Sequence, residues 1–242
     1  MKSEFLTSRE LRIFRQQIDL PSVGLPGQEK IKKSKVLIAG AGGRGTFTLQ
    51  NLAAAGIGSI GICDNRIVDE TTLPRQNLYG NGDLGKQKAI ISKQKILETH
   101  PILHADIHNV FLSESNIIPI LSNYDLIADA TDNYEAHAVI DQAAQEAGKP
   151  VIFCALQNAV IFISVFHYTR NHSCQKLYDT GLLQNENSHI TNPLPAEVIQ
   201  YSLAGSLIAS EVLKIVLGIP GILDGTYLKF DITTFQMITK NL

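Results

Sequence analysis

The sequence predicts an α/β protein with a doubly wound, mainly parallel sheet, a helical arm before it and an antiparallel strand extension after it. The first observation is a short apolar run at 36–39 that leads through a glycine-rich turn into a helix-like stretch. The second is the alternation of short apolar segments with helix-spaced segments as far as residue 150, which is typical of a parallel sheet covered on both faces. After residue 150 two apolar strands follow each other directly, which predicts antiparallel pairing.

The glycine-rich turn, GAGGRG, indicates a nucleotide site. Glycines let the backbone turn tightly and approach a phosphate, and the helix N-terminus that follows presents free N–H groups. An acidic residue ends the next expected strand, nineteen residues after the last glycine, where a carboxylate accepts hydrogen bonds from ribose hydroxyls. A glycine turn alone can reflect geometry only, but these features in this order indicate a Rossmann-like unit. The residues predicted to bind the nucleotide are Gly40, Gly42, Gly43, Gly45 and Asp64.

Residues 1–33 are expected to form a helical arm, and residues 34–242 a single Rossmann-like domain. In the arm, Ser8 is the expected N-cap of a first helix, 20–27 breaks that helix, and 28–33 forms a short second one. The long polar connection at 65–83 is expected to take part in function, as long loops without their own secondary structure commonly do. In the parallel part we expect strands at 36–40, 59–64, 103–111 and 124–129, and helices at 46–55, 86–98, 115–121 and 134–147.

The remainder of the chain is expected to extend the sheet. Residues 151–168 predict two strands joined by a turn at 157–159. The polar stretch 169–195 is expected to be a long crossing loop. It is followed by a long apolar helix at 196–217 and by one or two terminal strands within 223–240.

Composition narrows the classes of partner. The chain has 242 residues with a formal net charge of −2, and its Lys and Arg residues are scattered, so nucleic acid is not an expected partner. The strongest apolar run, 151–166, is too short and too polar at Gln157 and Asn158 to span a membrane. Three cysteines without CxxC spacing, and a first segment without a secretory pattern, predict a cytoplasmic location.

Charged residues are expected to gather at the same edge of the sheet as the glycine turn. Arg75 and Gln76 lie in the polar connection, Lys88 lies near a helix start, and Asp132 and Asn133 follow the strand at 124–129. The carboxyl ends of strands in an open α/β sheet converge on one crevice. Arg and Lys neutralise phosphate oxygens there, and a carboxylate such as Asp132 holds Mg²⁺ against them. The set exceeds what the pyrophosphate of a dinucleotide needs, so a triphosphate with Mg²⁺ is the expected ligand.

Several short motifs together carry a resemblance to a known family. They are Arg12–Gln16, the turn at 40–45, Asp64, Arg75 with Gln76, Gly85 with Lys88, the run DATDN at 129–133, and Gly205 and Ser206 with Glu211. Each motif is modest, but their order and spacing are specific and cover nearly the whole chain. The sequence resembles the MoeB/ThiF/HesA family of ubiquitin-activating-enzyme-like adenylyltransferases.

The resemblance implies an enzyme that binds Mg-ATP, adenylates a carboxylate and releases pyrophosphate. The implied acceptor is the C-terminus of a ubiquitin-like sulfur carrier, with a small-molecule or peptide carboxylic acid as the other class. Arg75 and Lys88 would contact phosphates, and Asp132 would hold Mg²⁺. Arg15 resembles an arginine that reaches from the arm into the partner subunit's site, which implies a homodimer. Positioning and charge neutralisation supply most of the acceleration, because a carboxylate is already nucleophilic at neutral pH.

The chain departs from the family pattern at four places. Cys174 stands alone where most relatives carry the first of two CxxC pairs for zinc, so no zinc is expected. Residues 184–195 lack the cysteine that several relatives use after adenylation, so the reaction is expected to stop at that step. Thr72 replaces an asparagine of the family, and His137 an arginine. One interpretation of these two changes is an altered acceptor, such as a small acid or a short peptide.

Other hypotheses stay open at this stage. The glycine turn and Asp64 permit an NAD(P)-dependent oxidoreductase, although the charged cluster would then lack a function. Thr72, His137 and the missing cysteines permit a non-catalytic nucleotide-binding partner subunit. Arg44 faces either solvent or a phosphate. The spacing of His100, His104 and His108 resembles a set of metal ligands, but the alternation around it favours a strand.

Overall fold

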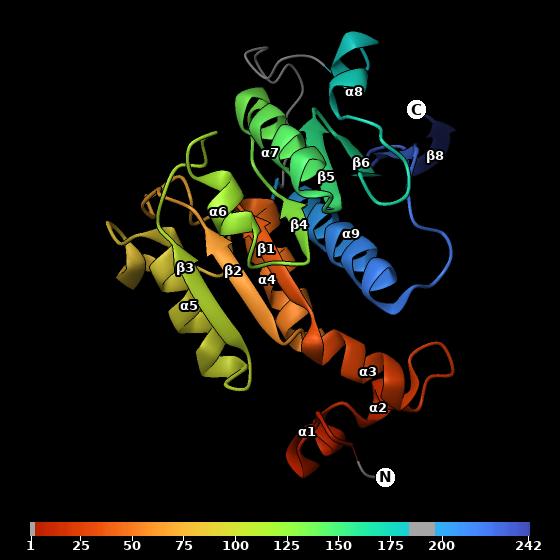
Figure 1. Cartoon of the computed structure of the whole chain (residues 1–242). Coiled ribbons are helices and arrows are strands. Elements are labelled where there is room, and N and C mark those ends of the chain that lie inside the picture. Colours follow the sequence, from red (N-terminus) through yellow and green to blue (C-terminus); the bar gives the residue numbers. More distant parts are fainter. Residues whose placement is uncertain (1–2, 184–196) are drawn as a thin grey trace.

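The computed structural model describes residues 3–183 and 197–242, which contain one eight-stranded sheet. The strand order is β3-β2-β1-β4-β5-β6-β7-β8 (Figure 1). The pairings from β3 to β5 are parallel, and those from β5 to β8 are antiparallel, as the sequence predicts. The strands are β1 (Lys35–Ala39), β2 (Ser59–Cys63), β3 (His104–His108), β4 (Leu126–Asp129), β5 (Val151–Gln157), β6 (Val160–Phe166), β7 (Thr226–Asp231) and β8 (Gln236–Asn241).

Helices cover both faces of the parallel part (Figure 1). One layer is α4 (Gly43–Ala55), α5 (Lys88–Thr99) and α9 (Glu197–Leu217), and the other is α6 (Ile117–Leu121) and α7 (Tyr134–Ala147). Strand β1 shows why the fold needs both layers. Val36 and Ile38 pack in the core under the first layer and Leu37 and Ala39 under the second, and all four are at most 1% exposed. A run without polar residues is stable only in a strand buried on both faces, where each large side chain contributes about 1.5–3 kcal/mol.

The antiparallel part packs aromatic side chains on one face. Strands β5 and β6 are joined at Asn158, which has a φ of 55°, so the predicted hairpin is confirmed. Phe153 and Phe166 pack edge to face, with ring centroids 5.8 Å apart. The predicted crossing loop is wrong over 175–179, which form helix α8 (Gln175–Asp179) and bury Leu177 among these rings. Residues 184–195 of that loop lie outside the described residues.

The arm contains α1 (Ser8–Ile13), α2 (Arg15–Ile18) and α3 (Gly24–Lys33) and projects away from the amino end of β1 (Figure 1). Two predictions about it are wrong. The N-cap is Thr7 rather than Ser8, because Thr7 Oγ1 accepts from the backbone of Glu10 and the Glu10 carboxylate accepts from the backbone of Thr7. The break is shorter than 20–27, because α3 already begins at Gly24 and places Pro26 in its first turn, where a missing N–H costs nothing.

Helices α4 and α9 pack closely along their lengths. A Cβ at Gly205 would lie 2.6 Å from the Cβ of Phe47, so only glycine permits this approach. Within residues 3–183 and 197–242, α9 is the one helix long and apolar enough to cross a membrane, with a hydropathy of 1.2 over Val198–Leu217. It buries Ala204, Ile208 and Val212 completely against the sheet and α4, which is how a core helix packs.

Candidate nucleotide site

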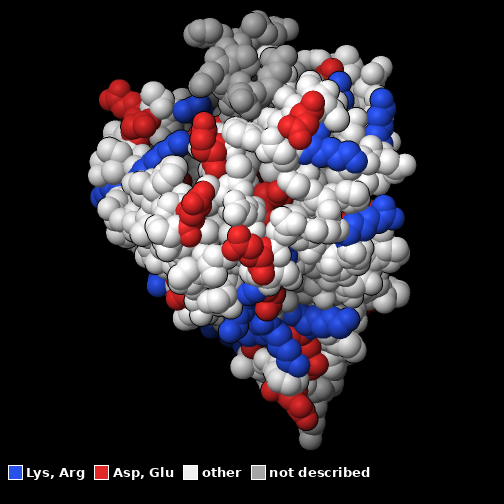
Figure 2. Space-filling model, turned by 45° about the horizontal axis from the view of Figure 1, so that its top comes forward, with Lys and Arg blue, Asp and Glu red and all other residues white. Residues whose placement is uncertain are grey.

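A cavity of about 540 Å³ lies at the carboxyl ends of β1, β2 and β4. This is the point where the strand order reverses direction, which is where open α/β sheets bind ligands. Figure 2 turns this end of the molecule forward and shows basic and acidic side chains lying beside one another on the face. The cavity lining includes nine of the eleven residues predicted from the sequence: Gly40, Gly42, Gly43, Asp64, Arg75, Gln76, Lys88, Asp132 and Asn133.

The glycine turn has a separate reason for each glycine. Gly40 has a φ of +94°, which disfavours any side chain. A Cβ at Gly43 would lie 2.4 Å from the ring of Tyr201, and one at Gly45 would lie 1.8 Å from the carbonyl oxygen of Gly40. Gly42 differs, because the nearest protein atom to a Cβ there would be 3.8 Å away. The protein itself therefore does not need a glycine at Gly42, whereas a ligand in the cavity would.

Asp64 is held in place by backbone donors. Its Oδ2 accepts from the N–H of Ala41 at 2.8 Å, and its Oδ1 accepts from the N–H of Arg66 at 2.7 Å. These bonds connect the end of β2 to the glycine turn after β1. Each carboxylate oxygen keeps a second lone pair, so the group can still accept hydrogen bonds from a ribose.

An ion pair crosses the cavity between the segments after β2 and β4. Arg66 Nη1 lies 2.8 Å from Asp132 Oδ2, and Nη2 lies 3.0 Å from Oδ1. Partial burial works to raise the pKa of Asp132, but Arg66 outweighs it and holds that pKa below its usual range. Asp132 is therefore ionised at neutral pH and able to bind a cation.

Two polar residues of the cavity are almost fully buried, and one side-chain atom of Gln76 lacks a partner in the described part of the chain. Lys88 lines the cavity and is 6% exposed. Burial lowers the pKa of Lys88, while the charges of Asp64 and Asp69 act in the opposite direction. Gln76 is also 6% exposed, and its Oε1 has no partner in the described part of the chain. A ligand with negative charge and a donor would satisfy both groups.

Arg75 is placed by a turn in the polar connection. The Oδ1 of Asp69 accepts from the N–H of Thr72 at 3.0 Å and from its hydroxyl at 3.1 Å. The Nε of Arg75 then donates to the carbonyl of Thr71 at 3.0 Å. Thr72, which departs from the family pattern, is buried and supports this turn.

His137 does not line the cavity but supports it from behind. It is fully buried in α7, and its Nδ1 lies 2.7 Å from Oδ2 of Asp129 at the end of β4. Burial works to raise the pKa of Asp129, but His137 and Thr131 outweigh it and lower that pKa. Oδ1 of Asp129 accepts from the hydroxyl of Thr131 at 2.7 Å, so the pair fixes the turn that presents Asp132.

Two predicted site residues lie outside the cavity lining. Arg15 is on α2 in the arm, exposed, and its Nε pairs with Asp19 at 2.8 Å. Gly45 shapes the glycine turn from behind, through its contact with Gly40. Arg44, in contrast, is part of the cavity lining and does not face solvent: it is 4% exposed, its Nη1 donates to the carbonyl of Cys154 at 2.8 Å, and its Nη2 donates to the carbonyl of Thr131.

Sequence reasoning missed three residues of the site. Arg66 lies in the polar connection, and its distance of two residues from Asp64 was the available signal. Phe111, which follows β3, and Ile67 form an exposed apolar edge of the cavity. No motif marks them, because an exposed apolar residue in a loop has no periodic pattern.

A second polar cluster lies outside the cavity, and we call His167, Ser173, Cys174 and Asp141 the Asp141 cluster. Asp141 Oδ1 lies 2.9 Å from Nε2 of His167, and Oδ2 accepts from the hydroxyl of Ser173 at 2.5 Å. The backbone of Cys174 donates to the same carboxylate at 3.3 Å. Burial raises the pKa of the Cys174 thiol far above its usual range, so the thiol is unreactive. The cluster ties the start of the crossing segment to α7.

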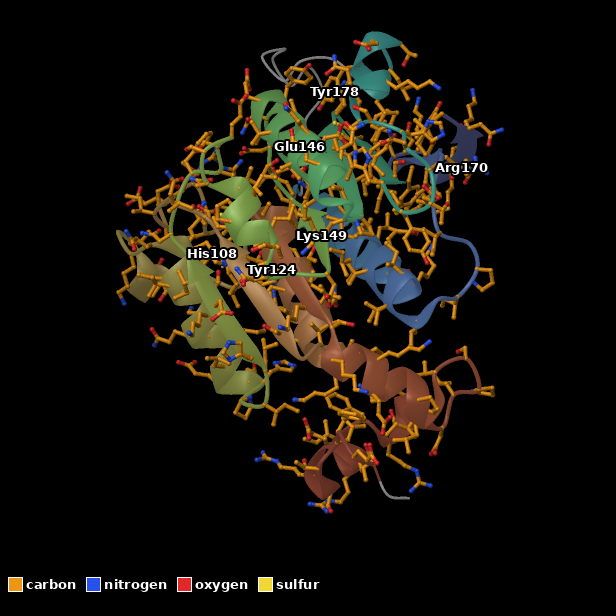
Figure 3. The ribbon with its side chains drawn as sticks, viewed as in Figure 1. His108, Tyr124, Glu146, Lys149, Arg170 and Tyr178 are labelled. Atoms are coloured by element: carbon orange, nitrogen blue, oxygen red, sulfur yellow. The ribbon has the colours of Figure 1, made fainter. Side chains whose placement is uncertain are left out.

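Side chains also fix the C-terminal end of α6 and the residues that follow it. Figure 3 labels Lys149, whose Nζ donates to the carbonyls of Leu121, Ser122 and Tyr124. It also labels His108 and Tyr124, joined by a 2.6 Å hydrogen bond. Strand β3 begins at His104 and ends at His108, which confirms the strand expected there. The described residues contain no group of three or more side chains that could hold a metal ion.

Comparison with known proteins gives consistent matches. A model of the ThiF family matches residues 14–242. A probable molybdopterin-synthase adenylyltransferase from Porphyra purpurea is 37% identical over 223 residues, which cover 92% of this chain and 58% of that protein. A sulfur carrier protein adenylyltransferase from Thermus thermophilus is 34% identical over 229 residues, covering 93% and 84%. The chain thus spans little more than half of the first relative and most of the second.

Solved structures share the fold. PaaA superposes with a TM-score of 0.81 at 21% identity, over 100% of this chain and 86% of that one. Escherichia coli MccB with ATP superposes with a TM-score of 0.76 at 23% identity, over 100% and 73%. At these identities the likeness shows the architecture alone.

Proposed function

This chain belongs to the ThiF family, and we propose that it is an Mg-ATP-dependent adenylyltransferase that activates a carboxylate as an acyl-adenylate. The observation that carries the proposal is the convergence of Arg66, Arg75, Lys88 and Asp132 on one cavity beside the glycine turn. A cavity with this excess of cations at a strand switch point fits a triphosphate better than it fits a dinucleotide. The relatives named as adenylyltransferases support the same reaction.

The residues of the cavity fit ATP and Mg²⁺. Gly42 has a φ of −84°, which any residue adopts, and a Cβ there would meet only the side chain of Gln76, at an ordinary contact distance of 3.8 Å. Glycine at this position therefore favours the close approach of a ligand. Gln76 Oε1 is buried and lacks a protein partner in the described residues, and Lys88, which lines the cavity, is 6% exposed. Asp132 supplies one carboxylate, and Mg²⁺ commonly binds one or two carboxylates together with substrate phosphates.

Each side chain then has a distinct task. Asp64 accepts hydrogen bonds from the ribose, and the apolar edge at Ile67 and Phe111 faces the base. Lys88 and Arg75 contact the phosphates and stabilise the charge that develops as pyrophosphate leaves. When bound at Asp132, Mg²⁺ neutralises phosphate charge and orients the leaving group. The protein needs no general base, because the acceptor is already an ionised carboxylate.

The acceptor and the assembly are further parts of the proposal. One relative is named for a sulfur carrier protein, which favours the C-terminus of such a carrier as acceptor, and a small carboxylic acid or peptide is the alternative. Arg15 lies far along the arm from the cavity lining, so we infer that it acts on the site of a second copy in a homodimer. Such an enzyme would work in the cytoplasm.

ATP–pyrophosphate isotope exchange tests the proposed function, with cell extract separated by size as the source of acceptor. Exchange stimulated by the protein fraction supports a carrier, and exchange stimulated by the small-molecule fraction supports a small acid. ATP binding without exchange in either fraction would contradict the proposal and favour a non-catalytic nucleotide-binding subunit. Tight NADH binding with hydride transfer would favour an oxidoreductase instead.

A further inference from the structure

The ion pair between Arg66 and Asp132 occupies the carboxylate to which the proposed function assigns Mg²⁺. Both carboxylate oxygens accept from the guanidinium, at 2.8 and 3.0 Å. This parallel two-bond geometry is among the strongest and most directional that a carboxylate makes. The side-chain amide of Asn133 donates to Oδ1 as well, at 3.4 Å. Both oxygens of the metal-binding carboxylate are therefore hydrogen-bonded within the protein, and a guanidinium stands where a metal ion would approach.

The backbone at Arg66 is fixed while its side chain remains free to move. The N–H of Arg66 donates to Asp64 at 2.7 Å, and the carbonyl of Arg66 accepts from the N–H of Lys88 at 2.9 Å. The side chains of Arg66 and Asp132 are 57% and 58% exposed. An ion pair this exposed contributes little stability in water, so its guanidinium can leave when a stronger partner arrives.

The chemistry of the cavity identifies that stronger partner. A guanidinium binds phosphate oxygens in the same two-bond geometry that it uses with a carboxylate. Mg²⁺ on Asp132 with Arg66 still in place would bring two cations to one carboxylate within about 4 Å of each other, where they repel. A triphosphate entering beside Lys88 both attracts the guanidinium and supplies the remaining ligands that Mg²⁺ needs.

We propose that Arg66 occupies Asp132 in the nucleotide-free protein and moves to the triphosphate when ATP enters, so that Asp132 accepts Mg²⁺ only together with the nucleotide. This inference rests on the proposed function and adds a coupling between its two ligands. Because coupling is reciprocal, Mg²⁺ and ATP each raise the affinity for the other. The position of Arg66, two residues after the ribose-binding Asp64, places the guanidinium beside the nucleotide whose arrival it responds to.

Titration with Mn²⁺ alone, followed by the loss of its free-ion paramagnetic resonance signal, tests the first half of the proposal. We expect Arg66→Ala to bind Mn²⁺ about ten-fold more tightly than the wild-type protein when no nucleotide is present, a coupling of ordinary size. The gain should vanish in the double variant Arg66→Ala/Asp132→Ala. Arg9→Ala is the matched control, because Arg9 is an exposed arginine of the arm and lies outside the cavity lining.

Titration with ATP in the presence of EDTA tests the second half. Arg66→Ala should bind metal-free ATP about ten-fold more weakly, because a contact to the phosphates is lost, whereas Arg9→Ala should match the wild-type protein. Equal Mn²⁺ affinity in wild-type and Arg66→Ala protein, with ATP binding intact, would overturn the proposal. Failure of the folded wild-type protein to bind ATP would instead contradict the proposed function itself.

Discussion

The cavity and the Asp141 cluster contain similar buried polar groups but differ in how those groups are matched. In the cluster, both oxygens of Asp141 accept hydrogen bonds from side chains or backbone within the protein. In the cavity, Gln76 Oε1 lacks such a partner among the described residues. Burying a polar group without a partner costs about 1–3 kcal/mol, and a ligand in the cavity would remove that cost at Gln76. The hydrogen bonds of the Asp141 carboxylate are complete within the protein, whereas those of the cavity are not.

Removal of the Asp132 carboxylate from the cavity should have the largest effect on activity. Asp132→Ala should reduce ATP–pyrophosphate exchange about a thousand-fold, because the metal and the phosphates lose their anchor. The circular dichroism spectrum should not change, because the side chain is half exposed. Glu114→Ala removes an exposed carboxylate outside the cavity lining and should leave exchange at the wild-type rate. Unchanged exchange in Asp132→Ala would remove Asp132 from the site.

His137→Ala should destabilise the fold by about 3 kcal/mol, because it leaves Asp129 buried without its partner. The pH dependence has a defined sign. The pKa of Asp129 is lowered in the folded protein, so the pair stabilises the fold above about pH 4 and loses that effect as pH falls through the folded value. The stabilities of wild-type and variant proteins, measured by urea unfolding, should therefore converge below about pH 4.

The control for this variant is His104→Ala, because the side chain of His104 is 69% exposed. Its unfolding free energy should lie within about 0.5 kcal/mol of the wild-type value at every pH. If His137→Ala lost no more unfolding free energy than His104→Ala does, Asp129 would not depend on His137 for its stability.

Lys88→Met should reduce exchange about a hundred-fold and at the same time stabilise the nucleotide-free protein. Removing a cation whose desolvation opposes its charge should raise Tm by about 2–4 °C, and the further rise on adding Mg-ATP should be smaller than in the wild-type protein. Lys93→Met, on the same helix and outside the cavity lining, should change neither quantity appreciably. A Tm that falls in Lys88→Met would mean that the ammonium is already satisfied in the folded protein.

The smallest effect is expected in the Asp141 cluster. Ser173→Ala removes one hydrogen bond to a charged group and should cost about 1–2 kcal/mol of unfolding free energy, with no change in exchange. If exchange fell ten-fold or more, the cluster would belong to the functional site and the comparison would fail.

Local signals were enough to predict the elements that position the site. Helix α7 lies at 134–147 as predicted, because Asn133 caps its start and Gly148, with a φ of 62°, ends it. The glycine turn and Asp64 were found because a strand, a turn and a carboxylate follow at fixed spacing. The N-cap was misplaced by one residue, because the choice between Thr7 and Ser8 depends on whether Glu10 reaches back.

The charges of the site were harder to predict than its backbone. Lys88, Asp132 and Gln76 are predictable from their places beside the strand ends and from the family pattern, but the burial of Lys88 and Gln76 is visible only in three dimensions. Arg66 was missed because a charged residue in a non-periodic loop gives no sign of its partner sixty-six residues later. The proposed role of Arg15 depends on a contact between two copies of the chain. The sequence and structure of a single chain do not contain such a contact.

The products formed from ATP labelled in its α-phosphate test the central claim most directly. With an acceptor fraction and Mg²⁺ present, the account predicts pyrophosphate together with labelled AMP, free or joined to the acceptor, and none of these in Asp132→Ala. Release of ADP and inorganic phosphate by the wild-type protein would contradict it, because cleavage would then fall between the β- and γ-phosphates and no adenylate would form.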